Sequence, residues 1–131
     1  MIITVIILMI LTVRCSADAI KYPDPVEMYT TAYTAEQGSI TASGCHVRTG
    51  ICAAKEEWMG KVAVIYSTDY ELLGIYEILD TGFGGDADGD GIGSIQEGKC
   101  IDVFMETDAD MRIWMKRTGG KCLVQIIDGK G

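Results

Sequence analysis

Short apolar runs separated by glycine-rich connections dominate the chain beyond residue 25. Five of these runs are rich in Val, Ile, Leu and Tyr and have the lengths typical of strands. They cover residues 28–34, 61–66, 73–79, 100–105 and 122–127. Glycine-rich turns lie between them, at residues 43–44, 82–93 and 119–120. Since the runs do not alternate with helices, the pattern predicts a small β-barrel rather than a βαβ fold.

One helix is predicted, over residues 108–117. Thr107 precedes it and Asp110 follows three positions later, which is typical of a capped helix start. Two consecutive glycines at residues 119–120 end the helical pattern. Trp114 lies among the apolar residues of this helix, so we expect its indole to pack in the core rather than to stack on a sugar.

The N-terminal residues form a separate apolar segment. Residues 2–13 (IITVIILMILTV) contain no charge, but twelve residues are fewer than the ~20 that a membrane-spanning helix needs. The sequence Ala17-Asp18-Ala19 follows, and it fits an A-x-A cleavage site. We therefore expect residues 1–19 to be a signal peptide, or alternatively an N-terminal anchor or a buried strand. Residues 20–131 would then form one domain that is secreted or associated with the cell envelope.

The charge of the chain bears on its binding partners, and its cysteine content bears on disulfide formation. The chain has 19 acidic against 11 basic residues, a formal charge of −8, and no basic patch, which argues against a nucleic-acid partner. Without the leader, an even number of cysteines remains: Cys45, Cys52, Cys100 and Cys122. In an exported domain this predicts disulfides of unassigned pairing, the alternative being four reduced thiols. The oligomeric state is left open.

The acidic run between residues 86 and 97 matches the calcium-binding loop of an EF-hand. Asp86, Asp88 and Asp90 fill its first three ligand positions, the Ile92 carbonyl fills the fourth and Glu97 the bidentate last one. Glycines before the run and a β-rich segment after it do not suit the flanking helices of an EF-hand. No cofactor is expected to be required, and the loop predicts either a structural Ca²⁺ ion or a solvated hairpin tip.

Two further aspartates, one at the end of an apolar strand and one inside another, suggest acid–base chemistry. Asp80 closes the predicted strand 73–79, and Asp102 lies between Ile101 and Val103. Burial disfavours an ionised carboxyl group, and a second carboxylate nearby raises the pKa further. A carboxylic acid that stays protonated near neutral pH is what cleavage of a glycosidic bond requires. The alternative is that Asp80 caps a turn and Asp102 points outward from an edge strand.

Several short blocks in a fixed order resemble a known family. They are Thr31-Ala-Tyr33, Ile40-Thr-Ala-Ser-Gly44, Val47-Arg-x-Gly50, Asp80-Thr-Gly82 and Ile101-Asp-Val-Phe104. Together they resemble the 3D (three-aspartate) domain of bacterial and phage cell-wall proteins over residues 28–128. That domain is similar to the catalytic double-psi β-barrel of membrane-bound murein lytic transglycosylase A. The resemblance implies a mainly β fold, a small six-stranded double-psi β-barrel with one short helix.

The resemblance also implies an activity and its residues. The activity is lytic cleavage of the MurNAc–GlcNAc β-1,4 bond of peptidoglycan glycan strands, which leaves 1,6-anhydro-MurNAc ends. Asp102 would be the acid/base, Asp80 would orient the substrate or tune the acid, and the third family aspartate would be Asp110 or Asp108. The hydroxyls of Thr41 and Ser43 would contact the sugar or the carboxylates, and Tyr33 would line the cleft or pack beside it.

The chain departs from the family pattern between its two central aspartates. An acidic insertion separates them, and Glu97 and Cys100 stand where the family has Lys and Arg. Loss of these two positive charges is expected to raise the pKa of the acid. It also keeps open a non-catalytic barrel that binds cell-wall glycan, or a barrel module stabilised by calcium.

Overall fold

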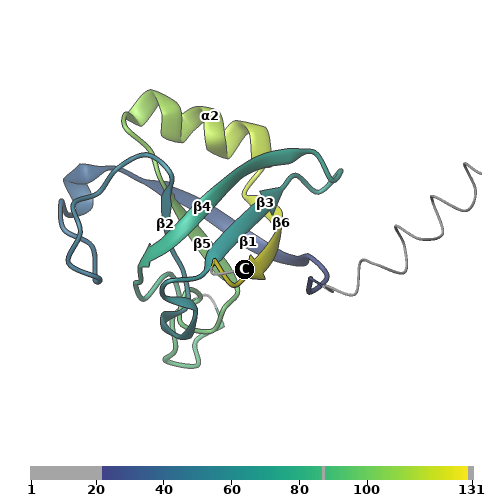
Figure 1. Cartoon of the computed structure of the whole chain (residues 1–131), viewed down its shortest axis with the longest axis horizontal. Coiled ribbons are helices and arrows are strands. Elements are labelled where there is room, and N and C mark those ends of the chain that lie inside the picture. Colours follow the sequence, from purple (N-terminus) through teal and green to yellow (C-terminus); the bar gives the residue numbers. More distant parts are fainter. Residues whose placement is uncertain (1–21, 87, 130–131) are drawn as a thin grey trace, which may run out of the picture.

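The computed structural model describes residues 22–86 and 88–129, so the predicted leader (residues 1–19) lies outside the described part. Six strands form a closed barrel (Figure 1). In chain order they are β1 (Val26–Tyr33), β2 (Ile51–Ala53), β3 (Val62–Tyr66), β4 (Leu72–Asp80), β5 (Cys100–Phe104) and β6 (Lys121–Ile127). Two short 3-10 helices, η1 (Ala35–Gln37) and η2 (Glu56–Trp58), lie in the connections on either side of β2.

The strands follow one another around the barrel in the order β1-β5-β2-β4-β3-β6. The pairs β1–β5 and β2–β4 are parallel, and the other four pairs are antiparallel. Parallel neighbours cannot be joined by a tight hairpin, and neither parallel pair is consecutive in the chain. The strand β3 lies between β2 and β4, and the strands β2, β3 and β4 lie between β1 and β5. The predicted fold class is confirmed: the protein is mainly β, a closed six-stranded barrel compatible with the double-psi arrangement.

The five strands predicted from the apolar runs are all present, with ends that differ by at most two residues. The sixth, β2, was not predicted. It has only three residues, Ile-Cys-Ala, and all three are buried. A run this short has no measurable periodicity, so pairing with β4 and β5 defines it rather than local sequence.

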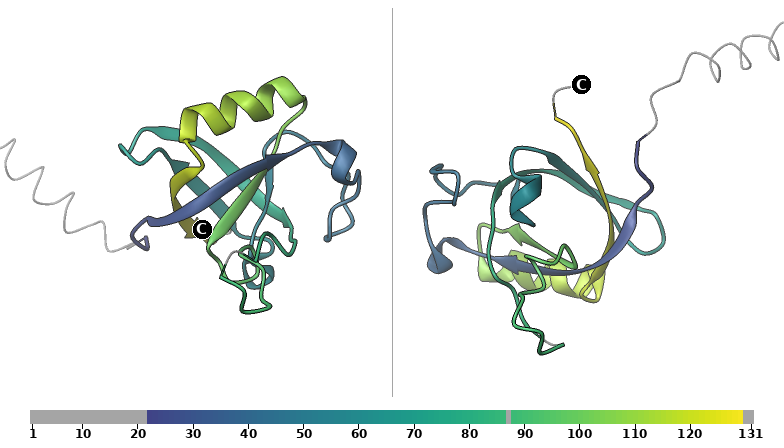
Figure 2. Two further views of the ribbon diagram at one scale, coloured as in Figure 1. Left: turned by 180° about the vertical axis from the view of Figure 1, so that it is seen from behind. Right: turned by 90° about the horizontal axis from the view of Figure 1, so that it is seen from below.

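The helix α2 (Asp108–Thr118) lies across one end of the barrel (Figures 1 and 2). Thr107 caps its start by accepting a hydrogen bond from the Asp110 N–H (3.1 Å), and Gly119 ends it in the left-handed conformation (φ 65°). Trp114 is the buried residue of this helix and packs on the barrel interior, as predicted. The interior itself is formed by apolar residues of all six strands, among them Met28, Cys52, Ala63, Ile65, Ile78, Ile101, Val103 and Val124.

Replacing Trp114 with phenylalanine is expected to lower the free energy of unfolding by about 2 kcal/mol. The Trp114 indole N–H donates a hydrogen bond to the buried Thr30 Oγ1 at 3.0 Å, and phenylalanine cannot supply this donor. Urea unfolding at constant m-value would measure the loss. The half-buried Trp58 offers the control: an equal loss in Trp58→Phe would contradict a special role for the Trp114–Thr30 bond.

The described cysteines are free thiols, so the predicted disulfides among them are not formed. Cys100 pairs with the exposed Tyr29, whereas Cys122 pairs with the preceding residue of β1, Met28, in the barrel interior. Adjacent strand positions face opposite sides, so these two thiols lie on different sides of the barrel wall. Cys52 also faces the interior, but β2 and β6 are opposite one another in the ring. Cys45 is exposed in the connection between β1 and β2.

No helix within residues 22–86 and 88–129 is both long enough and apolar enough to cross a bilayer.

Candidate active site

Asp80 and Asp102 lie on the same outer face of the barrel because both pair with one residue of β2. Ala53 is the register partner of Asp80 on β4 and of Asp102 on β5. Side chains of register partners lie on the same side of a sheet, and strands are ~4.8 Å apart, so the two Cα atoms are roughly 10 Å apart. Ala53 lies between them in the register of the sheet. The unpredicted strand β2 thus sets the separation of the two carboxylates.

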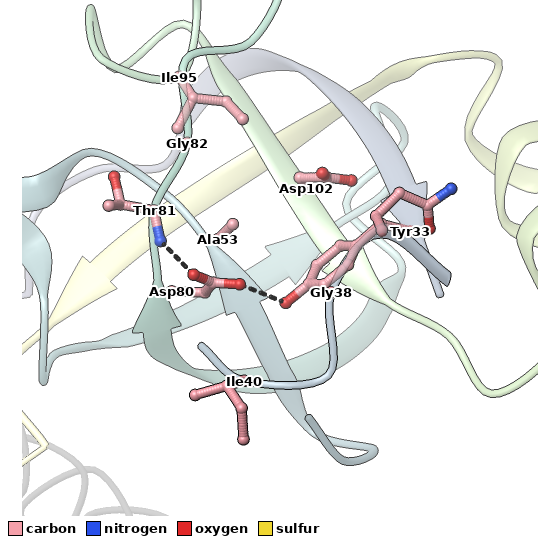
Figure 3. A pocket seen from close by; sticks show the side chains of 10 residues that line it. Tyr33, Gly38, Ile40, Ala53, Asp80, Thr81, Gly82, Ile95 and Asp102 are labelled. Atoms are coloured by element: carbon pink, nitrogen blue, oxygen red, sulfur yellow. Dashed lines mark hydrogen bonds between the residues drawn. The ribbon is translucent and has the colours of Figure 1, made fainter. Parts of the chain in front are cut away.

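The Asp80 carboxylate is held by three hydrogen-bond donors. Its Oδ1 accepts from the Ala42 N–H and the Thr81 N–H, both at 2.9 Å. Its Oδ2 accepts from the Tyr33 hydroxyl at 3.2 Å. Figure 3 shows the bonds from Thr81 and Tyr33. Burial and the neighbouring Asp80 raise the pKa of Tyr33, so its phenol stays protonated and remains a donor. Asp80 is therefore a fixed acceptor with a defined orientation.

Asp102 has a different environment. It is half-buried on the outer face of β5, and the Thr31 hydroxyl donates a hydrogen bond to its Oδ1 at 2.9 Å. Burial, together with the charge of Asp80, raises the pKa of Asp102 from 3.8 to about 6, although the Thr31 hydrogen bond opposes the change. The direction is the one predicted from its apolar neighbours. A substantial fraction of Asp102 is therefore protonated in mildly acidic solution.

Both carboxylates face one pocket of about 260 Å³. Figure 3 shows Asp80 and Asp102 on two sides of it, with the Tyr33 ring between β1 and Asp80. The rim is formed by the segment after β1, the end of β4, and the loop between β4 and β5. The lining residues are Tyr33, Gln37, Gly38, Ile40, Ala53, Asp80, Thr81, Gly82, Ile95 and Asp102.

The turn that contains Thr41 and Ser43 supports the site from behind rather than lining this pocket. Thr41 is buried, its Oγ1 lies 2.8 Å from the Ser43 Oγ, and it accepts a hydrogen bond from the Cys45 N–H (3.1 Å). These contacts fix the turn so that the Ala42 N–H points at Asp80. Sequence reasoning selected the hydroxyls and missed this backbone donor, because no side-chain signal identifies an N–H group.

The candidates for a third aspartate lie away from the pair. The Asp110 Oδ2 accepts a hydrogen bond from the Thr107 hydroxyl at 2.9 Å, at the start of α2. Asp108 lies in a separate depression of about 180 Å³ beside Glu36 and Glu106. Neither residue lines the Asp80–Asp102 pocket. Of the predicted catalytic aspartates, the structure thus brings Asp80 and Asp102 together. It also places Thr31 and Ala53 beside them, which were not predicted as site residues.

The acidic loop brings part of the predicted calcium ligand set together. Carboxylate oxygens of Asp86, Asp88 and Asp90 lie within 4.8 Å of one another. Glu97 does not join them in this conformation: its carboxylate forms an ion pair with Lys99 at 2.6 Å, and the same Lys99 amine lies 3.5 Å from Asp88. The loop runs from the strand β4 to the strand β5, which agrees with the expectation that no EF-hand fold surrounds it.

The site as a whole consists of one carboxylate held by three donors and a second carboxyl group with a raised pKa, both facing the same pocket. The two groups differ in environment although they share a pocket, and such a difference is how paired carboxyl groups acquire separate chemical roles. A scan against protein-family models and a search of curated proteins find no match to this chain.

Proposed function

We propose that this protein is a peptidoglycan lytic transglycosylase of the three-aspartate (3D) type that acts in the cell envelope or outside the cell. Its substrate would be the MurNAc–GlcNAc β-1,4 bond of glycan strands, and its product a 1,6-anhydro-MurNAc end. The observation that supports this is the position of Asp102, a half-buried carboxyl group of pKa about 6 that shares a pocket with Asp80. A group with this pKa can both donate and accept a proton near neutral pH.

The reaction needs one group that changes between acid and base. Protonated Asp102 gives its proton to the glycosidic oxygen as the bond to MurNAc C1 breaks, which releases the GlcNAc O4 as a hydroxyl. Asp102, now a carboxylate, then takes the proton of the MurNAc C6 hydroxyl while that oxygen bonds to C1. The proton returns to Asp102 and no water is consumed, which distinguishes the route from ordinary glycoside hydrolysis.

Asp80 acts in this proposal as a fixed negative charge. Its three donors hold the carboxylate in one orientation, facing the side of the pocket where positive charge develops on the sugar ring. The same charge contributes to the raised pKa of Asp102. Asp110 exchanges hydrogen bonds with the capping residue Thr107 at the start of α2 and has no part in the proposed reaction.

Digestion of purified murein sacculi tests the proposal, with mass spectrometry of the products. We expect muropeptides with anhydro ends. The rate should fall as the pH rises above about 6, because the acid must be protonated when it meets the substrate. Sacculi that bind the protein but release no product across the range from about pH 4.5 to 8 would contradict catalysis.

One observation favours a second candidate, a barrel that binds cell-wall glycan without cleaving it. None of the described residues that line the Asp80–Asp102 pocket is Lys or Arg. The positions where the family has these cations hold Glu97 and Cys100 here. Sedimentation with sacculi in the absence of released muropeptides would identify this candidate.

A structural calcium ion in the 86–97 loop stays a prediction from the sequence. Calcium that binds only the folded state would raise the free energy of unfolding by about 1.4 kcal/mol at ten times its Kd. Thermal melts with and without Ca²⁺ would measure this, and Asp88→Asn should abolish the response because it removes a member of the carboxylate cluster. Asp69→Asn, in the exposed turn between β3 and β4, is the control that should still respond. A response that persists in Asp88→Asn would contradict a site in this loop.

A further inference from the structure

A second, larger hollow adjoins the Asp80–Asp102 pocket. It measures about 760 Å³, within the range of about 300–1,000 Å³ that is usual for ligand sites. The 82–99 loop forms one wall, and the outer faces of β1 and β5 form the other. Gly82, Ile95 and Asp102 line both hollows, so Asp102 lies at their junction. We call the larger hollow the loop pocket; its further lining residues are Tyr29, Thr31, Phe83, Gly84, Gly85, Asp88, Ser94, Glu97, Lys99 and Cys100.

Backbone contacts within the loop preform this wall. The Ile95 N–H donates to the Phe83 carbonyl (3.1 Å), and the Ser94 N–H donates to the Gly85 carbonyl (2.9 Å). The two sides of the loop approach so closely that a Cβ on Gly93 would lie 1.7 Å from the Phe83 carbonyl oxygen. Only glycine fits at that position. The two ends of the loop are therefore packed together and position Phe83, while Asp86, Asp88 and Asp90 between them are exposed.

The lining of the loop pocket suits the face of a sugar ring. Most of its surface is apolar, and it carries two aromatic side chains, Phe83 and Tyr29, which are 48% and 59% exposed. Flat aromatic surfaces pack well against the C–H face of a pyranose, and Thr31 and Ser94 add hydroxyl groups for polar substituents. The thiol of Cys100 adds a further weakly polar surface at the floor.

The charges of the loop pocket select against acidic ligands. Its acidic and basic side chains are three carboxyl groups, those of Asp88, Glu97 and Asp102, and one amine, that of Lys99. The Lys99 amine is already paired with Glu97 at 2.6 Å and lies 3.5 Å from Asp88, so these two carboxylates offset its positive charge. A ligand carboxylate placed here would meet a net negative charge.

We propose that the loop pocket is a second binding subsite, selective for an uncharged N-acetylhexosamine ring. The inference rests on the proposed function for its chain direction: with Asp102 at the junction, the ring in the loop pocket belongs to the leaving group. In peptidoglycan that ring is GlcNAc, which has no ionisable group, whereas MurNAc carries a lactyl ether and the peptide stem. The insertion between the two aspartates thus determines which end of a glycan strand enters on which side of Asp102.

Binding of chitotetraose, an uncharged GlcNAc oligomer, to the full chain tests this inference without reference to cleavage. Isothermal titration should show Phe83→Ala binding about tenfold more weakly than wild type, which reflects loss of the aromatic wall. Tyr70→Ala, which removes another exposed aromatic ring, in the turn between β3 and β4, is the matched control and should leave Kd unchanged. A hyaluronan tetrasaccharide, which contains GlcNAc and two uronate carboxylates, should bind at least about tenfold more weakly than chitotetraose.

The outcomes separate this inference from the proposed function. No measurable binding of chitotetraose, equal Kd values for Phe83→Ala and Tyr70→Ala, or hyaluronan bound as tightly as chitotetraose would each overturn the subsite. Chitotetraose binding that depends on Phe83, without any cleavage of sacculi, would support the subsite and contradict the transglycosylase. Cleavage that is unaffected in Phe83→Ala would support the enzyme and contradict the subsite.

Discussion

Asp102→Asn is expected to reduce the release of anhydro-muropeptides from purified sacculi by about a thousandfold. The amide has nearly the shape of the carboxyl group and can still accept the Thr31 hydrogen bond, but it has no proton to give to the glycosidic oxygen. Both proton transfers of the proposed reaction pass through this one side chain, so no other described residue in the pocket replaces it. Quantitative mass spectrometry of digests at about pH 5, where the acid form predominates, would measure the effect.

The same variant is expected to be more stable than wild type at neutral pH, which excludes unfolding as the cause of lost activity. The folded-state pKa of Asp102 is about 6, against an ordinary value of 3.8. Between these values the folded protein holds a proton that the unfolded chain has released, so the contribution of Asp102 to stability falls as the pH rises through this window. Above it the ionised, half-buried group costs about 2 kcal/mol, which asparagine does not.

Urea unfolding at about pH 4 and pH 7.5 would measure this difference. We expect Asp102→Asn to match wild type at the lower pH and to exceed it at the higher one. Asp69→Asn, a change to an exposed aspartate in the turn between β3 and β4, should show no such dependence. A variant that keeps its activity, or that loses activity and stability together at pH 7.5, would contradict the assignment of Asp102.

The local sequence pattern was sufficient to predict five of the six strands and the helix α2. Runs such as residues 61–66 and 73–79 carry enough consecutive apolar and β-branched residues to specify strands whatever their neighbours. The helix α2 has both of its ends encoded, by Thr107 and by the glycines at residues 119–120. The outer-face position of Asp102 also follows from strand periodicity, because it alternates with Ile101 and Val103, which are fully buried in the barrel interior.

The features that could not be predicted depend on contacts between distant parts of the chain. The strand β2 exists because β4 and β5 pair with it on either side, and its three residues alone do not predict it. The Ala42 N–H became a site group only through the turn that Thr41 stabilises. Disulfides were predicted from an even number of cysteines, but whether two thiols meet depends on which side of the barrel wall each faces.

Ala53→Val is expected to lower cleavage of sacculi by about a hundredfold, although Ala53 has no chemistry of its own. The residue stands on β2 between Asp80 and Asp102 and lines their pocket. Two added methyl groups would fill part of a space of only about 260 Å³ and would displace the sugar from the line between the two carboxylates. Misplacement of the reacting bond by about 1 Å is enough for a loss of this size.

Ala63→Val separates this effect from overpacking in general. Ala63 is a fully buried strand alanine as well, but it lies in the barrel interior, among the residues of the main core. Both variants are expected to lose about 1–3 kcal/mol of unfolding free energy, since each adds volume to a packed site. Only Ala53→Val should then lose activity at temperatures where both remain folded. If the two variants lose activity equally, the outer-face position of Ala53 has no specific role, and the pocket between Asp80 and Asp102 is not where the glycan is cleaved.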